Sequence, residues 1–245
     1  YIYSSVININ DSYINNNSTE NGTIEANGST LDINRSEIIG NGNAQSSTSV
    51  LKSINSFSTF NHCLIADNTS TGRTIWSVAS STGSLELKNI TFVNNHSAAG
   101  ISNHIVFSSF NGVIENSIFY NNNSNLINIQ EQDILSISYT NINEDNISFD
   151  SQEDLLLGEG NIDTDPLFCN ADSSDFTLYD NSPCVGTGQD GANMGALGVG
   201  CYQDIIEPPD TLWTRTFGGE GWDGSKAVIQ TNDGGFISIG STNSY

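Results

Sequence analysis

One short pattern recurs along the first 145 residues, and its spacing leaves few folds open. The pattern is an apolar residue, a small residue three positions later, a second apolar residue two positions beyond that, and Asn three positions further on. Ile90 takes the small position in one copy, and Asp145 takes the Asn position in the last. The middle positions are Ser12, Ser36, Cys63, Ile90, Ser117 and Thr140, at intervals of 24, 27, 27, 27 and 23 residues. A repeat of this length is too short for pairs of helices, so it restricts the fold to repeating β structure.

The two apolar columns are occupied in all six copies. The column before the small residue contains Ile9, Ile33, Phe60, Leu87, Ile114 and Ile137. The column after it contains Ile14, Ile38, Ile65, Phe92, Phe119 and Ile142. Further apolar patches lie between copies, at residues 74–78, 104–107 and 126–129. β-branched and aromatic residues alternating with period two indicate strands.

These columns predict an all-β fold, a right-handed parallel β-helix of about six or seven coils over residues 1–160. In such a solenoid each coil lies on the one before, and equivalent side chains form files through the interior. The alternative is an antiparallel sandwich with similar strand spacing. A sandwich does not require the same residue type at the same place in every copy, so we favour the solenoid.

The Asn column has two competing explanations. Its members are Asn17, Asn41, Asn68, Asn95 and Asn122, with Asp145 in the last copy. An Asn at a bend can adopt the left-handed conformation and hydrogen-bond the coils above and below it, which we favour because one requirement of each bend explains the repetition. The rival is N-glycosylation, which needs an exposed Asn-X-Ser/Thr. The chain has eleven such sequons, at Asn10, Asn16, Asn17, Asn21, Asn27, Asn34, Asn68, Asn89, Asn95, Asn122 and Asn146.

Charge narrows the possible partners. The chain has 6 Lys and Arg against 28 Asp and Glu, a formal net charge of −22, yet only 14% of its residues are charged. Nucleic acids and anionic lipids bind clustered Lys and Arg, so we expect neither as a partner. No apolar run approaches the length of a spanning helix, so we expect no insertion into a membrane.

From Gly160 the repeat pattern of the coils ends and a different kind of sequence begins. The words Asp165-Pro166-Leu167-Phe168, Ser182-Pro183-Cys184 and Gly195-Ala196-Leu197-Gly198 follow in that order. With the coils before it, this segment resembles the closing part of secreted right-handed parallel β-helix proteins, the pectin-lyase-like repeat proteins, over about residues 1–203. The resemblance implies an extracellular or cell-surface protein and a closing segment at 161–203.

Three of the four cysteines, Cys169, Cys184 and Cys201, lie in the closing segment, and Cys63 stands alone. The spacing contains no C-x-x-C pair, so a zinc or redox motif is not indicated. We expect one disulfide in this cluster and two thiols that pack as small apolar groups. Cys169 with Cys184 is the favoured pair, over Cys184 with Cys201.

After a linker at 204–210, which contains Glu207-Pro208-Pro209-Asp210, a tail follows at 211–245. Two motifs in this tail resemble one repeat of secreted bacterial blade-type β proteins. They are Trp213 to Gly219 and Asp233 to Phe236. A single blade cannot bury its own faces. We therefore expect the tail to be a docking or assembly element unless further blades follow it.

The sequence offers few candidate catalytic or metal-binding residues. A pectate lyase needs Arg or Lys beside carboxylates that hold Ca²⁺, but Arg35, Lys52, Arg73 and Lys88 fall at different places in the repeat. His62, His96 and His104 belong to different copies and different columns. The walls of the coils are poor in acidic residues, which are concentrated instead in 144–165. We interpret that segment as a solvent-exposed loop. A structural Ca²⁺ site at Asp163, Asp165 and Asp190 is the one metal hypothesis, and no catalytic residue or other cofactor is assigned.

These observations favour a non-enzymatic structural or adhesive protein of the cell surface. We expect a fibre or filament component that self-associates head-to-tail through its coil ends and residues 211–245, with glycans attached or bound. The alternative is a carbohydrate-active enzyme or a carbohydrate-binding module of the pectin-lyase-like class.

Overall fold

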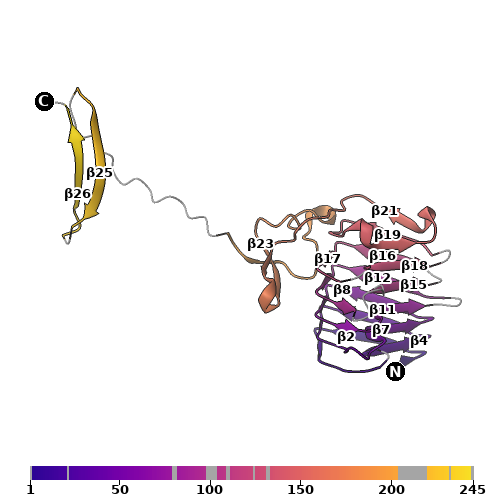
Figure 1. The fold of residues 1–245 in the computed structure, drawn as a ribbon. Helices are drawn as coiled ribbons and strands as arrows, with labels where there is room; N and C mark the ends of the chain where they lie inside the picture. The colour runs from indigo at the N-terminus through magenta and orange to yellow at the C-terminus, as the bar shows by residue number, and fades with distance from the viewer. Residues whose placement is uncertain are drawn as a thin grey trace. The chain divides into compact units, whose positions relative to one another are not determined.

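The structure, a computed structural model, describes residues 2–20, 22–78, 82–97, 104–108, 111–123, 125–130, 133–203, 220–231 and 233–243. The chain divides into two compact units, Tyr1–Gln203 and Asp204–Tyr245. The first unit is a parallel β-solenoid that winds through three sheets, here called the first, second and third walls (Figure 1).

The first and second walls each have seven strands. The first wall contains β1 (Ile2–Tyr3), β4 (Ile24–Asn27), β7 (Thr48–Ile54), β11 (Arg73–Val78), β15 (Ile105–Ser108), β18 (Ile127–Gln130) and β20 (Ile147–Phe149). The second wall contains β2 (Val6–Asn10), β5 (Thr30–Asn34), β8 (Phe57–Asn61), β12 (Ser84–Lys88), β16 (Gly112–Glu115), β19 (Leu135–Ser138) and β21 (Leu155–Leu157).

The third wall has five strands. They are β3 (Tyr13–Asn15), β6 (Glu37–Ile39), β9 (Leu64–Ala66), β13 (Thr91–Val93) and β17 (Ile118–Tyr120). A short parallel pair, β10 (Thr69–Ser70) with β14 (His96–Ser97), follows the third wall in two coils. The last coils also contain two 3₁₀ turns, η1 (Glu144–Asn146) and η2 (Gln152–Asp154).

The parallel pairing confirms the predicted files. Ile38 lies opposite Ile65, and Phe92 lies opposite both Ile65 and Phe119. The file from Ile9 continues in register through the second wall to Ile137 and then Leu157. These side chains form one continuous core along the axis, as a solenoid requires.

The number of complete coils is smaller than expected. Among the described residues, five windings contribute a strand to all three walls, which makes about four turns from β3 to β17. The two windings after β17 reach the third wall only through isolated bridges at Asn141 and Ile162. The expectation of six or seven coils counted apolar columns, and those columns continue into windings that lack a third strand.

The corners explain the small residues of the repeat. At the corner between the second and third walls, Asp11, Arg35, His62, Asn89, Asn116 and Tyr139 all have positive φ. The next residue is Ser or Thr in four coils, Cys63 in one and Ile90 in another. Two of the serine hydroxyls bond the neighbouring coil: the Ser12 and Ile90 backbone N–H groups donate to Ser36 Oγ and Ser117 Oγ, both at 3.1 Å. A small residue fits because it turns inward at a sharp bend.

The closing segment does not cap the end of the coil stack. It consists of β22 (Phe168–Asn170), η3 (Ala171–Ser173), β23 (Asp175–Tyr179), η4 (Gln189–Gly191) and β24 (Val199–Cys201). β23 pairs with both β22 and β24 in a small mixed sheet. Its Phe176 packs on Leu64, Ala66 and Val93, the outward residues of the third wall. The segment is therefore a lateral cover, and it explains why that wall is apolar on both faces.

The second unit contains one antiparallel hairpin, β25 (Asp223–Gln230) with β26 (Phe236–Thr242). Ile229 and Ile237 lie opposite each other, 64% and 55% exposed, and Val228 and Phe236 on the other face are 61% and 62% exposed. The described part of the tail thus buries neither face, as expected for a single hairpin.

Candidate functional site

The Asn column forms a buried ladder along the axis of the solenoid. Asn41, Asn68 and Asn95 are at most 1% exposed. The Asn68 Nδ2 group donates to Asn95 Oδ1 at 2.9 Å and to the Ile38 carbonyl oxygen at 2.9 Å. Asn68 Oδ1 accepts from the Asn41 backbone N–H at 2.9 Å and from Asn41 Nδ2 at 3.1 Å. Asn17 and Asn122 continue the chain of side-chain bonds at its two ends.

Only a primary amide of this length fits the ladder. Each interior side chain accepts two bonds from the preceding coil and donates to that coil's strand carbonyl and to the next Asn, which uses both sides of the amide. One detail of the prediction is wrong. The ladder residues themselves do not have positive φ; the residues just before them do, namely Asn16, Gly40, Asp67, Asn94 and Asn121. The left-handed residue makes the bend, and its successor turns inward.

The sequons differ in whether the Asn side chain is exposed to solvent or its Nδ2 donates hydrogen bonds within the protein. Asn10, Asn16 and Asn146 are exposed, whereas Asn27, Asn34 and Asn89 are half-buried, and Asn89 Nδ2 donates to Asn61 Oδ1 at 2.9 Å. In the four ladder sequons Nδ2 donates hydrogen bonds to the fold; these are Asn17, Asn68, Asn95 and Asn122. Asn21 lies outside the described residues. Each ladder Nδ2 donates at least two hydrogen bonds, and an N-glycan would replace one of its two hydrogens.

We predict the glycan distribution that follows. In the folded protein from a host that N-glycosylates, Asn10, Asn16 and Asn146 will carry glycans, and Asn68 and Asn95 will be empty. A glycan at either ladder position would replace an Nδ2 hydrogen that donates within the ladder and would add bulk to the interior. Site-by-site glycopeptide mass spectrometry of the monodisperse fraction measures this. Substantial occupancy of Asn68 or Asn95 in that fraction would contradict the ladder.

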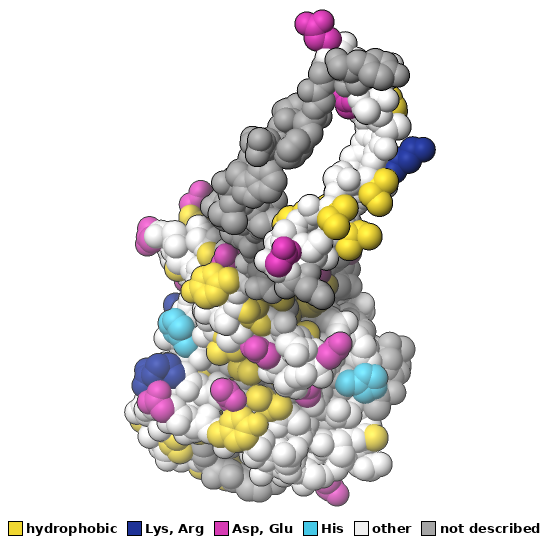
Figure 2. Space-filling model, turned by 90° about the vertical axis from the view of Figure 1, so that its left-hand side faces the viewer, with side chains coloured by type: hydrophobic (Ala, Val, Ile, Leu, Met, Phe, Trp, Pro, Cys, Tyr) yellow, Lys and Arg dark blue, Asp and Glu magenta, His cyan; other side chains and the backbone are white. Residues whose placement is uncertain are grey.

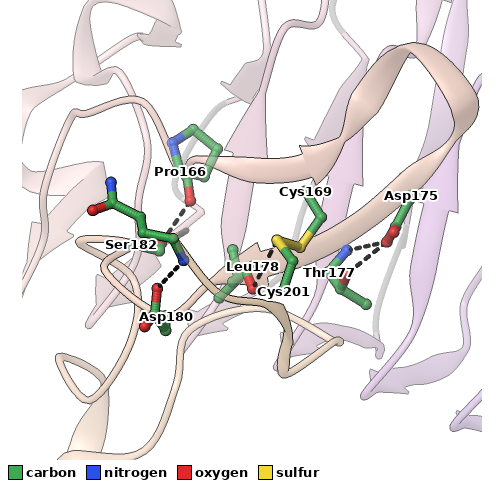
Figure 3. Close-up of a disulfide and its surroundings, with 9 residues drawn as sticks. Pro166, Cys169, Asp175, Thr177, Leu178, Asp180, Ser182 and Cys201 are labelled. Carbon is green, nitrogen blue, oxygen red and sulfur yellow. Dashed lines mark hydrogen bonds between the residues drawn. A yellow bond between two sulfur atoms is a disulfide. The ribbon is translucent and has the colours of Figure 1, made fainter. Parts of the chain in front are cut away.

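The disulfide joins Cys169 to Cys201, and not to Cys184 (Figure 3). The predicted pair of Cys169 with Cys184 is therefore wrong, as is the alternative of Cys184 with Cys201. β22 and β24 both pair with β23, which brings Cys169 and Cys201 together across that strand. Cys184 is instead a buried thiol whose sulfur accepts a 3.2 Å bond from Asn141 Nδ2, and burial raises its pKa.

Backbone and side-chain bonds fix the closing segment to the third wall. Asn116 accepts from the Gln189 N–H through its Oδ1 and from the Gly195 N–H through its carbonyl oxygen, both at 2.7 Å. Thr91 Oγ1 accepts from the Ala196 N–H at 3.0 Å. Within the segment, Ser182 Oγ donates to the Pro166 carbonyl oxygen at 2.5 Å (Figure 3). The sequence contained no signal for Asn116 or Thr91, because their partners lie 73 and 105 residues away.

The predicted calcium ligands do not form a cluster. Asp163, Asp165 and Asp190 are exposed, and no group of three or more potential metal ligands occurs among the described residues. Asp165 Oδ1 instead accepts from the Leu167 N–H at 2.9 Å, which holds the turn of the Asp-Pro-Leu-Phe word. The sequence hypothesis of a calcium site here gains no support from the geometry.

The four basic residues of the coils are engaged in structural contacts. Arg35 forms a two-pronged ion pair with Asp11, both contacts at 2.7 Å, and this bond lowers the Asp11 pKa. Lys52 lies 3.8 Å from Glu25, and Lys88 lies 2.9 Å from Glu86. Arg73 stacks over the Trp76 ring at 4.9 Å, and burial lowers its pKa. Lys88 also lies opposite Glu115 on the neighbouring strand β16.

The histidines likewise do not come together as a site. His104 is buried; its Nδ1 lies 2.9 Å from Thr74 Oγ1, and burial lowers its pKa. His62 and His96 are exposed. His62 Nδ1 lies 3.0 Å from the neighbouring Asn61 Oδ1.

The hollows on the described surface of the first unit include two shallow ones. One lies where the closing segment ends, and it is lined by Arg35, Ser36, Glu37, His62, Leu64, Ala196 and Leu197. The other lies in the last coils, lined by Ile142, Asn143, Glu144, Asp145, Asn161, Ile162 and Asp163. One face of the molecule is shown in Figure 2, where uncharged groups cover most of the described surface.

Comparison of the chain with protein-family models, with curated proteins and with solved structures gave no match. The described helices include none of the length and apolar character needed to cross a bilayer. The fold, the ladder and the disulfide are thus the observations on which a function has to be argued.

Proposed function

We propose that this chain is a non-enzymatic extracellular protein with a structural or adhesive role. The observation that carries the proposal is the buried Asn ladder, which bonds five successive windings into one rigid axial stack. Amide ladders of this kind add to the backbone bonds between stacked strands and make such stacks resistant to unfolding. A short rigid rod is a suitable unit for a surface fibre.

The disulfide and the surface composition support an extracellular location. Disulfides such as Cys169–Cys201 form and persist in oxidising compartments. The surface is rich in uncharged polar groups, and the chain holds 33 Asn, 34 Ser and 19 Thr. The resemblance to secreted pectin-lyase-like repeat proteins, and that of the tail to a blade-type repeat, belong to this proposal.

In the proposed assembly the N-terminal coil end of one copy contacts residues 211–245 of another, and Tyr3 and Val6 at that end are exposed. The hairpin β25–β26 exposes apolar side chains on both faces, which supports a contact there. We expect the average mass in sedimentation equilibrium to rise with protein concentration and with salt, because salt screens the repulsion between chains of net charge −22. A chain that stays monomeric at high concentration and high salt would contradict assembly.

The second candidate is carbohydrate binding, and the hollow beside the closing segment favours it. Glu37, His62 and Arg35 provide polar groups there over an aliphatic floor that includes Leu64 and Leu197. A panel of neutral and acidic polysaccharides, with and without Ca²⁺, separates the candidates. We expect no shortened or unsaturated products, and turnover of any substrate would overturn the non-enzymatic proposal.

A further inference from the structure

Within the described residues of the first unit, the C-terminal end of the coil stack leaves part of its core exposed. Leu157 belongs to the interior file of the second wall, yet it is 44% exposed, whereas Ile137 and Ile114 in the same file are fully buried. β20 and β21 are the last strands of their walls. The closing segment, which follows them in sequence, covers the third wall instead. We call β20, β21 and Ile134 the C-terminal edge.

The C-terminal edge lacks the features that usually protect a sheet edge. Its β21 strand reads Leu155-Leu156-Leu157, with neither charge nor proline, and Leu156 is 52% exposed. Ile134, on the adjoining coil, is 41% exposed. Proteins usually block edges with Lys, Pro, bulges or covering loops, because an open edge pairs with another strand.

Acidic residues are frequent in the windings that carry the C-terminal edge. The exposed acids of the last coils are Glu144, Asp145, Asp150, Glu153, Glu159 and Asp163. The sequence contains no Lys or Arg between Lys88 and Arg215, so no basic side chain of the last coils offsets them. A partner here has to contribute a strand and also positive charge.

We propose that the C-terminal edge binds an extended segment of a different protein, with alternating apolar residues and flanking Lys or Arg, by adding it as a further strand. Main-chain bonds to β21 supply affinity in such complexes, and side chains supply specificity. A second copy of this chain fits less well. Its first coil brings Asp11, already paired with Arg35, and Glu20, and each copy carries a net charge of −22.

This inference rests on the proposed adhesive role and names the chemistry of the partner. The probe is a fluorescent peptide of alternating Val and Thr with two Lys at each end, titrated into the full chain and followed by anisotropy. Matched peptides carry Glu in place of Lys, or N-methylated backbone groups on alternate residues. We expect binding of the Lys peptide only, weakening by tenfold or more between 50 and 500 mM salt, as charge screening requires.

Two variants locate the site. Leu156→Lys places a like charge against the Lys peptide and is expected to weaken binding at least tenfold. Phe57→Lys is the matched control, because Phe57 is 50% exposed on β8 of the same wall, far from the edge, and it should change binding less than twofold. Circular dichroism checks that both variants keep the wild-type fold.

Three results would overturn the inference: equal binding of the Glu peptide, equal effects of the two variants, or no binding at 1 mM peptide. Self-association that is abolished by Leu156→Lys would identify a second copy as the occupant, which also overturns it. The proposed function fails on separate measurements, namely polysaccharide turnover or a monomer at all concentrations. The two failures are therefore distinguishable.

Discussion

Replacing Asn68 by Ala will lower the free energy of unfolding by about 2–4 kcal/mol. The substitution removes four hydrogen bonds of a fully buried side chain. It leaves the Asn41 backbone N–H without its side-chain acceptor and takes one donor from the Ile38 carbonyl oxygen. An unsatisfied buried group costs about 1–3 kcal/mol. Urea denaturation followed by circular dichroism measures the loss, provided that the transition is two-state.

Two further variants separate hydrogen bonding from volume. Asn68→Asp keeps the shape but sets an acceptor against the Ile38 carbonyl oxygen and Asn95 Oδ1, so we expect a larger loss than for Ala. Asn8→Ala is the control, because Asn8 is exposed on β2 and should change stability by less than about 0.5 kcal/mol. If Asn68→Ala costs no more than Asn8→Ala, the ladder does not stabilise the fold.

The stacking of the coils could be predicted from the sequence because it depends on neighbouring copies of one pattern. In a parallel solenoid each residue meets its equivalent one coil away, so Ile65 between Ile38 and Phe92 is readable as a column. The Asn ladder follows in the same way, since one bend conformation recurs in each coil. The periodicity of the sequence therefore predicts both the register of the strands and which of these side chains point inward.

The closing segment could not be placed by the same reasoning. It has no repeat, and its contacts join residues far apart, such as Ala196 with Thr91 and Gln189 with Asn116. The outward apolar residues Leu64, Val93 and Ile118 were a signal for it, since an uncovered wall would be polar there. The cysteine pairing failed for the same reason, because it depends on the strand order β22-β23-β24.

For the candidate sites too, some features could be predicted from the sequence and others depend on the three-dimensional structure. The ladder sequons and the exposed sequons are identical as motifs, and only the coil position decides whether Nδ2 faces the interior or solvent. The acids at 163, 165 and 190 offer the hard oxygen ligands of a calcium site, but hydrogen bonding within turns, as at Asp165, is an equally good use of a carboxylate. Residue type alone does not distinguish these uses.

Breaking the disulfide will loosen the closing segment before the coils. We expect Cys169→Ser/Cys201→Ser to destabilise β22–β24 by about 2–4 kcal/mol, because the bond closes a loop across a separation of 32 residues. Protection of the Phe176 and Leu178 amides against hydrogen exchange should then fall by roughly 30- to 1000-fold, at about tenfold per 1.4 kcal/mol. Amides of β8 and β12 should change much less, because the Asn ladder and the core files hold them independently.

Reduction of the wild-type protein is the internal control for this prediction. A thiol reductant should reproduce the exchange pattern of the double variant and leave the variant itself unchanged, since Cys63 and Cys184 are already thiols. Opening of the segment also uncovers Leu64, Val93 and Ile118, so binding of an apolar dye should rise together with the exchange. Uniform loss of protection across coils and segment would instead mean that the two unfold as one unit, and that the cover is part of the core and not a separate layer laid over the third wall.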